Sequence, residues 1–65
     1  MTHKNKYLYL FVIQGFYDRL YGWEDLTAEE TYRDAKYRLA EYRANEPENH
    51  HRMIRRRELN TELEV

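Results

Sequence analysis

Tyrosine and arginine are the side chains of this 65-residue chain whose types and spacing could do chemistry, and that chemistry is non-covalent binding. Tyr7, Tyr9 and Phe11 alternate near the N-terminus, so a strand there places all three rings on one face. A neighbouring strand would bring some of the C-terminal arginines beside these rings. The candidate binding surface comprises Tyr7, Tyr9, Phe11, Arg52, Arg55 and Arg57, with Arg56 in the same run.

This combination of residues admits three interpretations. Rings can stack with the bases of a single-stranded nucleic acid while guanidinium groups meet its phosphates. Arginines can instead cover tyrosine rings by cation–π contact and keep an edge strand soluble. An exposed apolar sheet face can also bind a protein partner or form a homodimer. A formal net charge of −1 disfavours the nucleic-acid interpretation, which stays open as the alternative.

Other chemistry has little support in the sequence. His50 and His51, with Glu46 and Glu48, are the residues closest to a metal-like cluster, but adjacent strand residues point to opposite faces. The chain contains neither serine nor cysteine, which excludes acyl transfer by those nucleophiles. Its two glycines are isolated and form no phosphate loop. We therefore expect no enzymatic activity, no metal or other cofactor and no small-molecule substrate.

The elements that must position these residues follow from the hydrophobic pattern. Residues 7–14 are rich in aromatic and β-branched residues and are apolar on both faces, which is typical of a central strand. Residues 16–21, between Gly15 and Gly22, are expected to form the hairpin connection and the start of a second strand that ends near Leu26. Residues 51–59 predict a third, more polar edge strand.

A helix is expected between the second and third strands. Thr27 and Glu30 have the spacing of a capping box, so the helix should begin just after Thr27. Pro47 disfavours helical geometry at Glu46, so the helix should end near Asn45, giving about 18 residues. One apolar stripe is expected on it: Ala28, Thr31, Tyr32, Ala35, Leu39 and Tyr42.

These elements predict an α+β fold of β-β-α-β order, with a three-stranded antiparallel sheet (order 2-1-3) and the helix on one face. Leucine and valine are costlier to expose than tyrosine, so we expect the helix to cover Leu8, Leu10 and Val12 and leave the tyrosine face open. Tyr37 should lie on the outer side of the helix as a further candidate contact residue.

Length and composition limit the organisation of the protein. A chain of 65 residues predicts a single domain, ordered over about residues 6–59 with flexible tails. The apolar run near the N-terminus is too short to span a bilayer and lacks a signal-peptide cleavage site. We therefore expect a cytoplasmic protein with no membrane partner.

Four short segments carry a resemblance to a known group. They are VIQGFY at 12–17, GWEDLTAE at 22–29, NEP at 45–47 and IRRR at 54–57. Together they resemble short proteins encoded by tailed bacteriophages and prophages, and the likeness spans roughly residues 7 to 59. That group has no established activity to transfer. The resemblance implies an accessory phage protein acting in a bacterial host cytoplasm.

Overall fold

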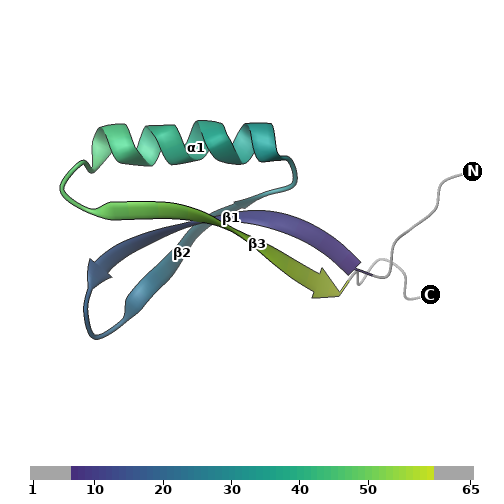
Figure 1. Cartoon of the computed structure of the whole chain (residues 1–65), viewed down its shortest axis with the longest axis horizontal. Helices are drawn as coiled ribbons and strands as arrows, with labels where there is room; N and C mark the ends of the chain where they lie inside the picture. Colours follow the sequence, from purple (N-terminus) through teal and green to yellow (C-terminus); the bar gives the residue numbers. More distant parts are fainter. Residues whose placement is uncertain (1–6, 60–65) are drawn as a thin grey trace, which may run out of the picture.

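The computed structural model describes residues 7–59 and contains three strands and one helix. In chain order these are β1 (Tyr7–Asp18), β2 (Gly22–Glu29), α1 (Tyr32–Asn45) and β3 (His50–Leu59). The strands form one antiparallel sheet in the order β2-β1-β3, and α1 lies across one side of it (Figure 1). The predicted α+β fold, strand order and central position of the first strand are confirmed. The flexible tails expected from the sequence lie outside the described residues.

The first strand is longer than predicted, because Gly15 does not end it. β1 runs for 12 residues to Asp18, and the hairpin turn follows at residues 19–21. The Asp18 carboxylate accepts a hydrogen bond from the Leu20 backbone N–H at 2.7 Å, and Gly22 has a positive φ of 68°, a conformation that suits glycine. The turn therefore lies directly before Gly22. β2 begins at Gly22, whereas the second strand was predicted to begin within residues 16–21.

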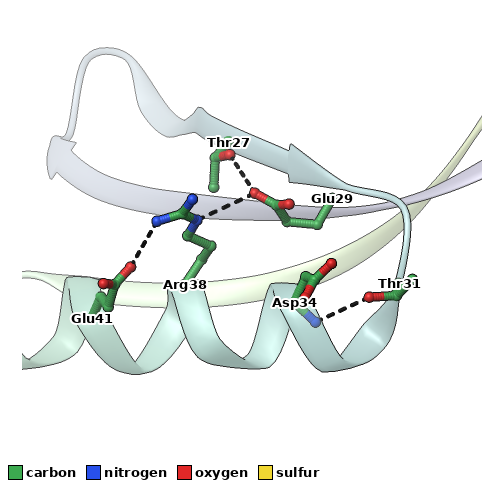
Figure 2. Close-up of polar contacts among 6 residues, drawn as sticks. All are labelled: Thr27, Glu29, Thr31, Asp34, Arg38 and Glu41. Carbon is green, nitrogen blue, oxygen red and sulfur yellow. Dashed lines mark hydrogen bonds and ion pairs between the residues drawn. The ribbon is translucent and has the colours of Figure 1, made fainter.

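The predicted helix start at Thr27 is wrong. Thr27 lies in β2 opposite Ile13, and its hydroxyl donates to the Glu29 carboxylate at 3.0 Å. The helix cap is Thr31, whose hydroxyl oxygen accepts from the Asp34 backbone N–H at 3.1 Å (Figure 2). Pairing with β1 satisfies the backbone of 27–29, and Thr31 with Asp34 supplies an equivalent cap four residues later. The helix thus has 14 residues, and its predicted end at Asn45 is confirmed.

The prediction of which sheet face the helix covers is also wrong. Tyr32, at the start of α1, makes an edge-to-face contact with Phe11 at 5.9 Å between ring centroids. Tyr42, near its end, stacks on His51 at 5.6 Å, and His51 pairs with Gly15. Phe11, Ile13 and Gly15 share one face of β1, so α1 covers the face that begins with the tyrosines.

The extra length of β1 explains this reversal. It adds Gly15 and Tyr17 to one face, where the Tyr17 ring occupies the space that a Cβ at Gly15 would need, while Gln14, the last residue of the predicted strand, lies on the other face. α1 brings Ala35 to the first of these faces, and Ala35 and Ile13 are both fully buried. Burying Gln14 beneath a helix would require new hydrogen-bond partners, whereas β2 and β3 supply them on the open face.

Arg38 ties the helix to β2 at the rim of this layer. Its guanidinium lies 3.5 Å from the Glu29 carboxylate and 3.0 Å from that of Glu41, one turn further along α1 (Figure 2). Arg38 and Glu41 are both at least half exposed, so we expect this pair of contacts to orient the helix more than to stabilise it.

Candidate functional site

The beginning of β1 and the end of β3 form a two-stranded ribbon that reaches beyond the rest of the sheet. β3 pairs with β1 from Tyr7, opposite Leu59, to Phe16, whereas β2 pairs with β1 only from Phe11 onward. Figure 1 shows this ribbon, residues 7–10 and 56–59, extending past the N-terminal end of α1. The ribbon therefore has no helix over it and no β2 beside it.

Four of the predicted binding residues meet on the helix-bearing side of the ribbon and its base. The Arg55 guanidinium lies 4.9 Å from the centre of the Tyr9 ring, and the Arg57 guanidinium lies 4.2 Å from that of Tyr7. Each arginine contacts the tyrosine diagonally across the two strands, since Arg57 is opposite Tyr9 in the ladder. We call Tyr7, Tyr9, Arg55 and Arg57 the Tyr–Arg cluster.

Two predicted surface residues lie elsewhere. Phe11 is half-buried under Tyr32, at the point where α1 begins to cover the sheet. Arg52 projects from the opposite face, where its guanidinium lies 4.2 Å from the centre of the Trp23 ring. The tyrosine face is thus divided: α1 covers it from Phe11 onward, and only the part on the ribbon is left uncovered.

The open face of the sheet carries a polar network that was not predicted from the sequence. Gln14 is 6% exposed, donates to the Asp25 carboxylate at 2.8 Å and accepts from Arg52 Nε at 2.8 Å. Arg56 donates to both oxygens of Asp25, at 2.5 and 3.2 Å. The sequence contained one signal of this network: Gln14 is the one polar residue in the predicted first strand, and a buried amide needs hydrogen-bond partners.

Arg56 also explains why an apolar residue on the open face is buried. Arg56 lies on β3 opposite Leu10, and Asp25 lies on β2 opposite Gln14. The ion pair must therefore cross β1 above Val12, which sits between Leu10 and Gln14 on that face and is only 2% exposed. The stem of an arginine covers apolar surface in this way while its charged end stays near water.

The same network predicts a loss of stability in acid. The Arg56 guanidinium, and then the Gln14 amide, lower the pKa of Asp25 below its ordinary 3.8. The ionised carboxylate therefore stabilises the fold above about pH 4, and that stabilisation is lost as the pH falls through the lowered folded-state value. Asp25→Asn should consequently cost more stability at about pH 7 than at about pH 2 when both are measured by urea unfolding. An equal cost at both values would contradict the role given to this ion pair.

A second polar cluster joins the loop after α1 to the sheet. The Tyr17 hydroxyl donates to the Glu46 carboxylate at 2.5 Å, and His51 Nε2 lies 3.0 Å from the same oxygen. Partial burial, followed by the hydrogen bond to Glu46, raises the pKa of Tyr17 to about 12. The Tyr17 hydroxyl and then the His51 ring hold the pKa of Glu46 below its usual value.

The His51 side chain is fully buried, and its two ring nitrogens differ in their surroundings. Nδ1 is buried and has no hydrogen-bond partner, while Nε2 faces Glu46 and, at 3.4 Å, the Tyr17 hydroxyl. A proton on Nε2 can be donated to the Glu46 carboxylate, whereas Nδ1 has no partner within reach. The Tyr42 and Tyr17 rings enclose His51, so this cluster holds the 46–49 loop against β3.

Tyr37 lies, as predicted, on the outer side of α1. It is 74% exposed and lines a shallow hollow with Ala40 and Ala44, bordered by Arg33, Lys36 and Glu41. The tip of the β1–β2 hairpin exposes two further large apolar side chains, Leu20 (88%) and Tyr21 (75%). Both residues lie within 16–21, where the hairpin connection was predicted, but their exposure was not predicted.

Fold and site together define a small α+β domain with a single-helix layer and an overhanging two-stranded ribbon. No protein-family model, curated protein or solved structure matches this chain. Within residues 7–59, no helix is both long and apolar enough to cross a membrane. Over the same residues, no three His, Cys, Asp or Glu side chains gather so that they could hold a metal ion.

Proposed function

We propose that this chain is a small protein-binding module that engages its partner through the ribbon. The observation that carries the proposal is the ladder register. Leu8, Tyr9 and Leu10 pair with β3 but have no strand of the described chain on the β2 side. A two-stranded ribbon is marginally stable in water on its own, so an additional strand would stabilise it.

The exposed side chains of the ribbon support the same function. Leu8 is 39% exposed, Tyr9 52% and Leu59 57%, and they place apolar surface on both faces of the ribbon. Strand addition uses main-chain hydrogen bonds for affinity and alternate side chains for specificity. A partner that adds an extended segment beside β1 would contact Leu8 and Leu10 on one face and Tyr9 on the other. The resemblance to short phage proteins would place that partner in a bacterial cytoplasm.

Single-stranded nucleic acid is the second candidate ligand, and the Tyr–Arg cluster is the observation that favours it. Neither Arg55 nor Arg57 has an ion-pair partner within the described part of the chain, so both charges are available for phosphates. Against this, each guanidinium already lies over a tyrosine ring that a base would need for stacking. An NMR titration with mixed-sequence single strands at low salt tests it: no shifts at Tyr9, Arg55 and Arg57 would end this alternative.

Site-specific photo-crosslinking in cells tests protein binding. The full chain carries p-benzoylphenylalanine at Tyr9 or, as a matched control, at Tyr21, an exposed tyrosine on the hairpin tip. We expect a discrete crosslinked species from position 9 that is absent from position 21. Equal crosslinking at both positions, or none at position 9, would refute binding through the ribbon.

A further inference from the structure

The segment from Leu8 to Leu10 is a short sheet edge of its own, distinct from the edges formed by β2 and β3. β2 leaves the sheet at Glu29, opposite Phe11, and the chain then turns into α1. On the β2 side of Leu8–Leu10, the described chain therefore leaves a strand position vacant, in line with β2 itself. β3 continues along the other side of this segment to Leu59.

The other two edges carry features that prevent strand pairing, and this one does not. β3 presents a run of arginines, and β2 carries acidic residues and a register shift beside Leu26. Charges and bulges on edge strands oppose edge-to-edge association. Leu8, Tyr9 and Leu10 contain no charge, no proline and no register shift. Of the described edges, this is the one that is built to accept another strand.

We propose that a second copy of this chain pairs with this edge in antiparallel orientation, about a two-fold axis near Leu8. The inference rests on the proposed function and identifies its partner. Because the edge is uncharged, two copies meet there without opposing like charges, whereas an acidic partner would be drawn to Arg55 and Arg57 instead. The shared edge is thus self-complementary, as an isologous dimer interface must be.

The geometry of the sheet limits the register of this pairing. A two-fold axis between antiparallel strands is normal to the sheet, so both helices lie on the same side. In the register centred on Leu8, this leucine faces its own copy on the open side, and Tyr9 faces the other copy's Tyr7 on the helix-bearing side. The incoming strand occupies the row of β2 and must stop before Glu29, which centres the overlap near Leu8 and brings the two copies of Leu8 opposite each other.

The test is the oligomeric state of the full chain, measured by sedimentation velocity and NMR diffusion. The interface is short compared with standard interfaces, so we expect a weak dimer, with a Kd on the order of 0.1–1 mM. Leu8→Lys and Leu8→Glu each place like charges opposite each other and should weaken association at least about tenfold. An equimolar mixture of the two variants should recover association, because opposite charges then meet.

Leu59→Lys is the matched control, since it makes the same exchange at an exposed leucine on the far strand of the same ribbon. It should leave the dimer intact. A wild-type monomer at about 1 mM, undiminished association of Leu8→Lys, or a mixture that stays monomeric would each overturn self-pairing. A Tyr9 crosslink to a different protein would also overturn it, while leaving the proposed protein-binding function standing.

Discussion

Replacing Ile13 with alanine is expected to unfold most of the protein at about 25 °C. Ile13 is 0% exposed and sits in the central strand, between Thr27 of β2 and Met53 of β3 and beneath α1. Truncating a buried isoleucine costs about 2–5 kcal/mol, because the cavity left behind does not collapse completely. A core of this size supplies only about 3–5 kcal/mol in total. Far-UV circular dichroism and amide NMR spectra should show a mainly unfolded chain.

The matched control removes an equally large side chain from the surface. Leu20 is 88% exposed at the hairpin tip, so Leu20→Ala should change the free energy of unfolding by no more than about 0.5 kcal/mol. If Ile13→Ala unfolded cooperatively with a loss below about 1 kcal/mol, Ile13 would not be the centre of the core.

Replacing Gly15 with alanine is expected to expel the Tyr17 ring from its place over the sheet. A Cβ at position 15 would lie 2.6 Å from Cε2 of Tyr17 and 2.8 Å from its hydroxyl oxygen. β1 is held by strands on both sides at this position, so the ring must move rather than the backbone. Tyr17 would then lose its hydrogen bond to Glu46 and its ring contact with His51, which should lower the free energy of unfolding by about 1–2 kcal/mol.

The pKa of Tyr17 reports this displacement directly. In the wild type it is raised to about 12, so above about pH 10 the unfolded chain ionises Tyr17 while the folded chain does not. Stability is therefore complete below that pH and falls as the pH rises toward about 12. In Gly15→Ala the pKa should return toward its ordinary 10.0, as measured on ¹³C-labelled tyrosine by NMR. A wild-type pKa in the variant would show that the ring had stayed in place.

The second glycine provides the comparison, because it is needed for a different reason. A Cβ added at Gly22 would meet open space, but the residue has a φ of 68°, so Gly22→Ala should cost about 1–2 kcal/mol through backbone strain alone. It should leave the pKa of Tyr17 unchanged. Gly22→Asn should cost less than alanine, because asparagine tolerates left-handed geometry better.

Element boundaries were predictable where one local cause dominates. Pro47 ends the helix regardless of its surroundings, and the end at Asn45 was confirmed. Thr27 and Thr31 both had the residue types of a cap, and local chemistry could not choose between them. Thr27 pairs with Ile13 across the hairpin, which is a tertiary contact. Residues 27–29 therefore belong to β2, and Thr31 caps the helix.

In the candidate site, too, features with a local cause were predictable and features set by tertiary contacts were not. Alternation and strand order were enough to predict that arginines from β3 lie beside tyrosines from β1, and Arg55 and Arg57 lie over Tyr9 and Tyr7. The side to which Arg52 points depends on the strand register, which neither Met53 nor Ile54 settles, because both are apolar. The orphaned Nδ1 of His51 could not be foreseen, because its surroundings come from α1, β1 and the 46–49 loop together.

By itself, the sequence determined the element types, their order and a central first strand, because hydrophobic periodicity and proline act locally. Only the tertiary structure decided which side of that strand the helix covers. The cost of exposing leucine and valine favoured covering the aliphatic face, yet α1 packs on the tyrosine face, where Gly15 leaves room for the Tyr17 ring and Ala35 is fully buried. On the open side, the Gln14 amide forms hydrogen bonds with Asp25 and Arg52. With the helix on this side, Phe11 is covered, while Leu8 and Tyr9 lie on a ribbon whose free edge has room for another strand.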